Sequence, residues 1–488
     1  MTHFSRRNFL KTTAAAAACL VGAQSRVLGA NEDIRIGVIG FRSRGKDAIE
    51  NLRKIKGVRI VALCDADSAV LGAEVKRFEE RGEKVETYAD LRKMFEDKNI
   101  DAIASATPNH WHSLITVWAC QAGKDVYIEK PISHNVWEGR QCVLAARKYN
   151  RIVQAGTQSR SNPGMREAVE FIQKGGLGKI KIVRGLCYKP RASIGKVSGE
   201  QPVPASVDYD LWSGPAPKVP LTRKNLHYDW HWVWNTGNGD LGNQGIHQMD
   251  IGRWILGENE LSPKVLSIGG RLGYQDDGET PNTQIIYHAY AKAPLLFEVR
   301  GLPSKPESKE MDHYRGAQVG VVTQCEEGDV VMSSYATAVV FDKEGKEVKR
   351  FGETKKEDGK IARVEGNHYE NFINAVRSRK SSDLNGDVLE GHLSSALCHT
   401  GNISHLIGQQ ATPEEVRDAI KGNAELGETI SRVQAHLGIN GVELSKDKIT
   451  LGAWLTMDPK TERFTGNEKA NALLTRDYRK PFVVPEKV

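Results

Sequence analysis

The chain has 488 residues, which is too long for one hydrophobic core and predicts two domains with extensions. A hydrophobic content of 39% and a charged content of 26% are typical of a globular protein. The formal charge of +7 includes four positive charges in the first 30 residues, so only +3 remains for the rest of the chain. This modest charge argues against nucleic acid or an acidic membrane surface as a partner.

The chain opens with Ser5-Arg6-Arg7-Asn8-Phe9-Leu10-Lys11, followed by an alanine-rich apolar run over residues 12–24. Paired arginines before a short apolar stretch resemble a twin-arginine leader, which sends folded, cofactor-loaded proteins to the twin-arginine export machinery. The alternatives are an ordinary Sec signal or a membrane anchor, but the run is shorter than the ~20 residues that span a bilayer. We therefore expect a signal peptide over residues 1–30, a periplasmic or otherwise exported protein, and no stable membrane insertion of the mature chain.

The cysteines are spread along the chain without a CxxC pair or a repeated spacing. They are Cys19, Cys64, Cys120, Cys142, Cys187, Cys325 and Cys398. This pattern predicts single buried thiols rather than a disulfide framework. His227, His231 and Asp240 match no metal-ligand spacing, so no metal site is predicted.

From residue 34 to about 154, short apolar strands alternate with helical segments, a pattern typical of a doubly wound parallel (Rossmann) sheet. Further along, one helix is followed by longer alternating strands, for example over residues 179–185 and 284–291. We therefore expect an α+β C-terminal domain with a large open, mostly antiparallel sheet and helices on one face.

The expected domain boundaries follow from these changes in pattern. They are a Rossmann domain over residues 33–155, a substrate-binding and oligomerisation domain over 156–408, and a C-terminal extension over 409–488. Helices are expected near 165–174, 368–379 and 390–408, and the extension is predicted to begin with a single amphipathic helix over 413–437.

The turn after the first strand, Gly40-Phe41-Arg42-Ser43-Arg44-Gly45, fills the G-x-G-x-x-G pattern at its first and third glycines. Arg42 occupies the middle position, where the backbone normally approaches the pyrophosphate. We expect Arg42 and Arg44 to reach the phosphates at the helix N-terminus instead, the alternative being a surface loop with solvated arginines. Asp65 ends the second strand, where a carboxylate binds ribose hydroxyls. This favours NAD, with NADP as the alternative.

Three more polar motifs follow. They are Thr107-Pro108-Asn109-His110-Trp111-His112, Glu129-Lys130-Pro131 and Gly242-Asn243-Gln244-Gly245-Ile246-His247. Together they resemble the Gfo/Idh/MocA family, which includes glucose-fructose oxidoreductase and inositol dehydrogenase, and the resemblance covers residues 33 to about 408. The implied cofactor-binding residues are Gly40, Phe41, Arg42, Arg44, Gly45, Asp65, Thr107, Pro108, Asn109, His112, Glu129 and Lys130.

The expected catalytic residues are Lys130, His247 and Asn243. A lysine at the end of a parallel strand beside the crevice can stabilise the alkoxide that develops as hydride leaves the substrate. The resemblance implies a cis Lys130-Pro131 bond and makes His247 the base towards the substrate hydroxyl. The family carries an aspartate where this chain has Asn243, although a neutral imidazole can still accept a proton.

Substrate contacts are expected mainly from the second domain. Asp250 is spaced to share a helical face with Asn243 and His247. Trp232, within a run of three tryptophans, offers an apolar platform for a sugar, with His231 as its polar neighbour. The alternative is a buried aromatic cluster that anchors a loop. By resemblance, residues at the ends of second-domain elements also contact the substrate. They are Arg160, Tyr188, Lys189 and Arg191.

These observations predict an exported NAD(P)-dependent oxidoreductase that acts on the CH–OH group of a sugar, polyol or related carbohydrate. Outside the cytoplasm we expect a tightly held nucleotide that is recycled in place. The alternatives are an NAD-dependent glycosidase or lyase that works by transient oxidation, and a non-catalytic carbohydrate-binding protein. The resemblance also implies a homo-oligomer formed through the open face of the second sheet.

Overall fold

The structure is a computed structural model that describes residues 33–355, 361–363 and 366–488. The predicted leader and Cys19 lie outside these residues. The six described cysteines are buried free thiols, as predicted. Among the described residues, every helix falls short of the length and apolar character that a bilayer crossing requires.

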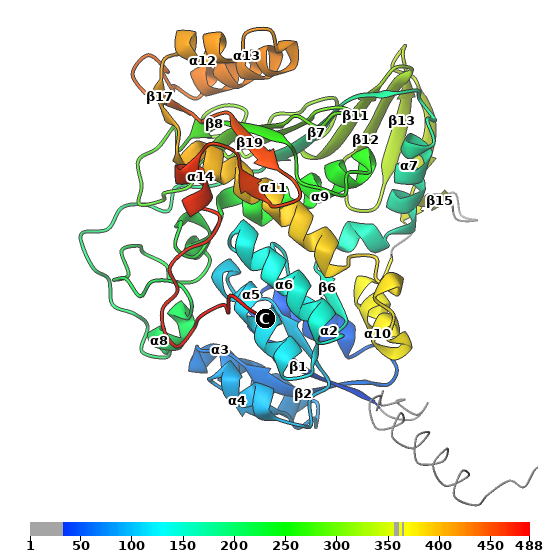
Figure 1. Ribbon diagram of the computed structural model, residues 1–488, viewed down its shortest axis with the longest axis vertical. Coiled ribbons are helices and arrows are strands. Elements are labelled where there is room, and N and C mark those ends of the chain that lie inside the picture. The colour runs from blue at the N-terminus through cyan, green and yellow to red at the C-terminus, as the bar shows by residue number, and fades with distance from the viewer. Residues whose placement is uncertain (1–32, 356–360, 364–365) are drawn as a thin grey trace, which may run out of the picture. The chain divides into compact units, whose positions relative to one another are not determined.

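The first sheet is parallel, with six strands in the order β3-β2-β1-β4-β5-β6 (Figure 1). Its strands are β1 (Ile34–Ile39), β2 (Val58–Cys64), β3 (Glu86–Tyr88), β4 (Ala102–Ser105), β5 (Asp125–Ile128) and β6 (Val153–Ala155). The intervening helices are α2 (Arg44–Leu52), α3 (Ser68–Glu80), α4 (Leu91–Glu96), α5 (Asn109–Gln121) and α6 (Val136–Lys148). The strand order reverses between β1 and β4, and doubly wound sheets bind ligands beyond the carboxyl ends of the strands at such a point. The predicted Rossmann fold is confirmed.

The second sheet is mixed and much larger, with twelve strands. Its main path runs β14-β13-β12-β11-β7-β10-β9-β8-β18-β17, and only the β7–β10 pair is parallel along it. These strands are β7 (Ile180–Tyr188), β8 (Lys264–Gly270), β9 (Thr283–His288), β10 (Leu295–Arg300), β11 (Val319–Cys325), β12 (Gly328–Met332), β13 (Ala338–Asp342), β14 (Glu347–Phe351), β17 (Gln409–Ala411) and β18 (Ile449–Leu451). The mostly antiparallel sheet of the sequence prediction is confirmed.

Shorter elements complete this half of the chain. Strands β19 (Leu455–Asp458) and β20 (Arg463–Phe464) branch from β8, and β15 (Glu353–Lys355) pairs with β16 (Ile361–Arg363). The helices are α7 (Pro163–Gln173), α8 (Tyr209–Ser213), α9 (Ile246–Leu256), α10 (His368–Ser378), α11 (Val388–Leu406), α12 (Pro413–Ala419), α13 (Ala424–Ile439) and α14 (Glu468–Ala472). Single turns of 3₁₀ helix lie at Gln158–Ser161, Asp229–Trp232 and Ser381–Asp383, and a π-helical turn lies at Leu241–Gly245.

Helices cover both faces of the second sheet, which corrects the expectation of helices on one face only. Helices α7, α9 and α11 pack on one face, while α13 packs on the other, on the opposite side of β8 from α11 (Figure 1). The apolar contacts of α13 come from Leu426, Ile430, Val433 and Leu437, buried against Leu266, Ile285 and Leu296 of the sheet. The C-terminal extension therefore occupies part of the face that the sequence analysis left open.

The extension begins with two helices instead of the single predicted helix. Helix α12 ends at Ala419, and α13 begins at Ala424 after Gly422, whose φ of +88° is a left-handed conformation that suits glycine. Asn423 then caps α13 by accepting a hydrogen bond from the backbone N–H of Leu426. A glycine followed by a capping residue was thus the signal for a break.

Two later segments of the chain contact the first domain. Helix α11 packs against both α6 and α9 and runs between the two sheets (Figure 1). The C-terminal tail crosses the outer helices, where Phe482 packs on the rings of Trp111 and Trp118 and the hydroxyl of Tyr478 donates to Glu138 over 3.0 Å. These contacts hold the first domain against the elements that carry the rest of the site.

Candidate active site

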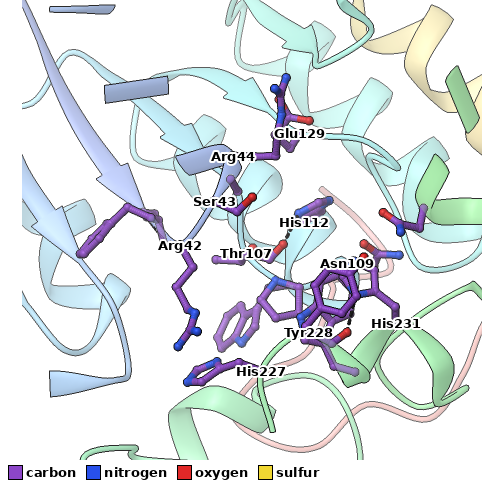
Figure 2. A pocket seen from close by; sticks show the side chains of 18 of the residues that line it. Arg42, Ser43, Arg44, Thr107, Asn109, His112, Glu129, His227, Tyr228 and His231 are labelled. Atoms are coloured by element: carbon purple, nitrogen blue, oxygen red, sulfur yellow. Dashed lines mark hydrogen bonds and ion pairs between the residues drawn. The ribbon is translucent and has the colours of Figure 1, made fainter. Parts of the chain in front are cut away.

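A cavity of about 960 Å³ opens beyond the carboxyl ends of β1, β2, β4 and β5 and extends to β7 and the π-helical turn of the second domain. Figure 2 shows the cavity with Arg42, Ser43 and Arg44 on the first-domain side and His227, Tyr228 and His231 on the other. It contains both the predicted dinucleotide turn and the predicted catalytic residues. The strand-order reversal between β1 and β4 places it there.

Two glycines shape the turn at the end of β1. Gly40 has a φ of +71°, and a Cβ atom there would lie 2.9 Å from the side chain of Thr107. A Cβ atom on Gly45 would lie 2.1 Å from the carbonyl oxygen of Gly40, so α2 can start close to β1 only with glycine at this position. Gly45 supports the turn from behind rather than lining the cavity.

The N-terminus of α2 is suited to an anion. Ser43 precedes the helix with a φ of 47°, its side chain does not cap the helix, and it lines the cavity together with Arg42 and Arg44. In Figure 2 the side chain of Arg42 extends from the turn towards His227. The positive end of the helix dipole and the guanidinium group of Arg42 are therefore available where a pyrophosphate is expected, whereas the Arg44 guanidinium points towards Glu129 and donates to Asp47 over 3.0 Å.

Asp65 lies directly after β2 and also lines the cavity. Its carboxylate accepts a hydrogen bond from the backbone N–H of Asp67 over 3.0 Å, and burial raises its pKa to about 6. A half-buried carboxylate with remaining acceptor capacity fits two ribose hydroxyls and disfavours a 2′-phosphate. The glycine cradle, the α2 N-terminus and Asp65 thus fit a nicotinamide adenine dinucleotide.

Hydrogen bonds of His112 and Asn109 hold the turn after β4 in place. His112 places Nδ1 2.6 Å from the carbonyl oxygen of Pro131 and Nε2 2.8 Å from that of Thr107, which ties this turn to the loop after β5. Asn109 donates to the side chain of Asn238 over 2.9 Å. His112, Asn109, Thr107 and Pro108 all line the cavity. The hydrogen bonds of His112 and Asn109 given above connect this turn to other loops of the protein.

Lys130 lies on the cavity wall after β5, and the Lys130-Pro131 bond is cis, as the resemblance implied. Its ammonium group donates to the backbone carbonyl of Asn243 over 2.7 Å. Burial lowers the pKa of Lys130 from 10.5 to about 8, against the opposing effect of the neighbouring Glu129 carboxylate. Glu129 itself is buried and accepts from Gln158 over 2.8 Å, with Arg44 at 3.7 Å.

His247 follows the π-helical turn and lines the cavity. Burial lowers its pKa well below 6.5, and the positive charges of Lys130, Arg44 and Lys189 lower it further. The imidazole is therefore neutral. A neutral imidazole can accept a proton from a substrate hydroxyl even when cations surround it. The imidazolium that forms is not stabilised from position 243, because Asn243 has no negative charge.

Tyr335 and Gln244 are cavity residues that the sequence analysis did not single out. Tyr335 lies between β12 and β13, with its ring 4.9 Å from the ring of His247, and its hydroxyl accepts a hydrogen bond from Gln244. Gln244 also accepts from the ammonium group of Lys189 over 3.1 Å. No local sequence pattern indicates Tyr335, because the pairing of the sheet strands brings it to the cavity. Gln244 belongs to the Gly242–His247 motif, which could have indicated it.

The aromatic segment lines the cavity with His227, Tyr228, Trp230 and His231. His231 stacks on Trp230 with ring centroids 3.6 Å apart, and both line the cavity. Burial lowers the pKa of His231 to about 3, so it is neutral. Trp232 has its ring 5.7 Å from that of His231 but lines a separate adjoining cavity of about 460 Å³, which corrects its predicted place as a platform in the main cavity.

Three other predicted substrate contacts lie away from the cavity lining. Arg160 and Asp250 form a buried bidentate ion pair with each other, at 2.9–3.0 Å, and Asp250 also accepts from Ser394. Tyr188 is buried on the outer face of the sheet and donates to Glu298 over 2.6 Å. The predicted helical face fails at Asp250, which lies three residues beyond His247 on α9 and bonds to Arg160 and Ser394 instead of lining the cavity.

Comparison with known proteins agrees with this geometry. Residues 34–157 match the family described as "Oxidoreductase family, NAD-binding Rossmann fold", and residues 178–294 match its C-terminal alpha/beta domain. Residues 3–23 match the twin-arginine translocation signal, which indicates export through that pathway.

Similar proteins include a myo-inositol 2-dehydrogenase of Thermotoga maritima, 24% identical over 46% of this chain and 55% of that protein. A glycosyl hydrolase family 109 protein of Shewanella sp. (strain ANA-3) is 29% identical over 28% of this chain and 36% of that protein. The chain thus spans about half the length, or less, of these curated relatives.

Among solved structures, the WlbA dehydrogenase from Bordetella pertussis, in complex with NADH and UDP-GlcNAcA, superposes with a TM-score of 0.55. It is 21% identical, and the match covers 76% of this chain and 94% of that one, a likeness of fold. The two matched domains agree with the parallel sheet and the dinucleotide turn. The chain therefore belongs to the Gfo/Idh/MocA family of oxidoreductases.

Proposed function

We propose that this protein is an exported, NAD-dependent oxidoreductase that acts on a CH–OH group of a carbohydrate in the periplasm or an equivalent compartment. The observation that carries the proposal is that one cavity contains the dinucleotide turn at Gly40, the carboxylate of Asp65, and both Lys130 and His247. The twin-arginine match supports a nucleotide loaded before export. Inositol and sugar-related names among the relatives support a polyhydroxylated substrate.

The proposed chemistry assigns each residue one task. A nicotinamide dinucleotide held by the Gly40 turn and Asp65 would supply the hydride acceptor for the substrate carbon. His247 accepts the hydroxyl proton on its neutral imidazole. Lys130, held by the carbonyl of Asn243, donates a hydrogen bond to the substrate oxygen as negative charge develops on it. Trp230 and His231 form the wall on which a sugar face stacks.

The nucleotide is proposed to stay bound through many turnovers, because an exported enzyme has no nicotinamide pool to draw on. Denaturing the exported, purified protein and identifying the released nucleotide tests this. We expect about one NAD(H) per chain, and reduction of that nucleotide when a substrate carbohydrate is added. A nucleotide-free protein that turns over only with added NAD would contradict the retention.

A second candidate function is glycoside cleavage by transient oxidation, in which the oxidised carbon acidifies a neighbouring C–H before hydride returns. The adjoining cavity of about 460 Å³ favours it, because it shares Arg191 and Tyr228 with the main cavity and offers room for a glycosidic substituent. The similarity to a glycosyl hydrolase family 109 protein supports the same idea. Product analysis separates the two functions, since a released aglycone without net redox change indicates cleavage.

A further inference from the structure

Two lysines, Lys130 and Lys189, enter the substrate end of the cavity from different domains and are held by the same short turn. Lys130 donates to the backbone carbonyl of Asn243 over 2.7 Å, and Lys189 donates to the side-chain oxygen of Gln244 over 3.1 Å. Both acceptors are neutral and adjacent in the π-helical turn. Among the residues that the structure describes, neither ammonium group has a carboxylate as its hydrogen-bond partner.

The carboxylates near these lysines are engaged by other cations. Asp240 forms a bidentate pair with Arg191, with contacts of 2.6 and 2.8 Å, and is buried. Glu129 lies 3.7 Å from Arg44 and accepts from Gln158. The remaining acidic residues of the lining, Asp65 and Asp90, lie at the carboxyl ends of β2 and β3, on the side where the adenosine is expected.

The lining as a whole therefore has an excess of positive charge. It contains five basic side chains, Arg42, Arg44, Lys130, Lys189 and Arg191, against three acidic ones, and Asp240 just behind the lining pairs with Arg191. A pyrophosphate would balance Arg42 at the α2 N-terminus, and Arg44 is already paired with Asp47 over 3.0 Å. Among the described residues, the hydrogen-bond partners of the Lys130 and Lys189 ammonium groups are neutral, and a partly buried charge without a bonded opposite partner is unfavourable.

We propose that the substrate is an acidic carbohydrate whose fixed anion, a carboxylate or a sulfate, binds Lys189 and completes the charge balance of the site. This inference rests on the proposed function, since it names the substrate class for the same cavity. Lys189 provides the specificity, because it can pair with an anion while its contact to Gln244 fixes its position. Lys130 remains available for the reacting hydroxyl, and its charge adds to the attraction.

The test is a calorimetric binding comparison on the protein saturated with NAD. The probes are D-glucuronate, D-galacturonate, D-gluconate and D-glucose 6-sulfate, each against D-glucose, D-galactose or the methyl ester of D-glucuronate. We expect at least one acidic probe to bind about 10- to 100-fold more tightly than its neutral counterpart, the range for one charge-assisted hydrogen bond. The carboxylate and sulfate arms identify which anion is preferred.

Three variants make the result specific. Lys189→Gln should remove the preference for the acidic probe and leave binding of the neutral probe within about twofold, because only the charge pair is lost. Lys189→Arg should keep the preference. Lys196→Gln, which changes an exposed lysine outside both cavities, should change nothing.

Three outcomes overturn the inference: binding of no acidic probe, equal binding of acidic and neutral probes, or an equal loss for both in Lys189→Gln. Calorimetry does not depend on turnover, so these outcomes are separate from a failure of the proposed function, which would appear as no nucleotide reduction by any carbohydrate. Retained NAD content and melting temperature in Lys189→Gln show that the variant is folded. If that variant fails to fold, Lys189→Arg and the wild-type comparison still decide the matter.

Discussion

The outer face of the second sheet and the substrate end of the cavity both contain buried charge, but they balance it differently. On the sheet, Glu298 is fully buried and accepts from Arg432 at 2.6 Å, Arg300 at 2.9 Å and Tyr188 at 2.6 Å. In the cavity, the ammonium group of Lys130 donates to a backbone carbonyl and has no carboxylate among its hydrogen-bond partners in the described part of the chain.

This difference separates charges that hold the fold from charges that face a ligand. Arg432 belongs to α13, so the network around Glu298 fastens the C-terminal extension to the sheet, with apolar contacts of the same helix around it. A matched buried pair is costly to break from one side. An unmatched buried cation lowers stability until a ligand arrives, which is a common feature of functional sites.

The largest expected effect is on stability, in Glu298→Ala. The change leaves Arg300 and Arg432 without their carboxylate, and we expect the free energy of unfolding to fall by about 3–5 kcal/mol. Denaturant unfolding monitored by circular dichroism measures it. Glu414→Ala, which breaks an exposed pair with Arg417 on α12, is the control and should cost less than about 1 kcal/mol. A Glu298 variant as stable as the wild type would contradict the structural role of the network.

Lys130→Met should have the opposite signature. Loss of the donor to the substrate oxygen should lower kcat by about 10²- to 10³-fold, while stability at neutral pH rises because an unmatched charge is gone. Single-turnover reduction of the bound nucleotide measures the first effect, and denaturant unfolding the second. If instead the variant were destabilised as strongly as Glu298→Ala, Lys130 would belong with the structural charges.

The pH dependence of stability sharpens the same contrast. The pKa of Lys130 is about 8 in the folded protein against an ordinary 10.5, so between these values the unfolded chain binds more protons. The penalty is fully present below pH 8 and is relieved as pH rises towards 10.5, by at most about 1.4 kcal/mol per pH unit. In nucleotide-free protein, the stability advantage of Lys130→Met over wild type should therefore shrink across this window. A constant difference would show that folding does not shift the pKa of Lys130, so that its charge carries no penalty in the folded state.

Asp65 contributes a smaller effect, on nucleotide choice. Asp65→Asn removes the negative charge that opposes a 2′-phosphate, and we expect the affinity for NADP relative to NAD to rise about tenfold. Titration of nucleotide-free protein with each cofactor measures the ratio. Glu50→Gln, on the exposed side of α2, should leave it unchanged. An unaltered ratio in Asp65→Asn would move the basis of NAD preference elsewhere, for example to Arg42.

The first domain could be predicted in detail because its signals are local. The alternation of strands and helices gave the sheet, and short motifs after β1, β2, β4 and β5 gave the cavity lining, since a doubly wound sheet brings those positions together. Lys130, Asp65 and His247 share one cavity as expected, although their catalytic and binding roles remain predictions.

The second domain was harder because its contacts are set by long-range pairing. Tyr188 and Arg160 lie at the ends of secondary-structure elements, where substrate contacts are often found. Tyr188 is bonded to Glu298 and Arg160 to Asp250, and each of these buried partners is more than 80 residues away in sequence. Asp250 lies three residues beyond His247 on α9, after the π turn at Leu241–Gly245, and is bonded to Arg160 rather than exposed to the cavity. Sequence alone shows neither the partner nor the turn, so these residues read as polar groups available to a ligand.

We expect the smallest effect at Tyr335. This residue lies between β12 and β13 of the second sheet and also lines the cavity, so it connects the two regions compared above. Tyr335→Phe keeps the ring beside His247 and removes the hydroxyl that accepts from Gln244, the residue that also holds Lys189. One neutral hydrogen bond contributes about 0.5–1.5 kcal/mol, so we expect KM to rise about two- to tenfold with kcat nearly unchanged. Steady-state kinetics on the preferred carbohydrate, with Tyr314→Phe on the outer face as control, measures the split. A fall in kcat as large as that of Lys130→Met would instead place the Tyr335 hydroxyl in the proton transfer itself, because positioning alone acts mainly on substrate binding.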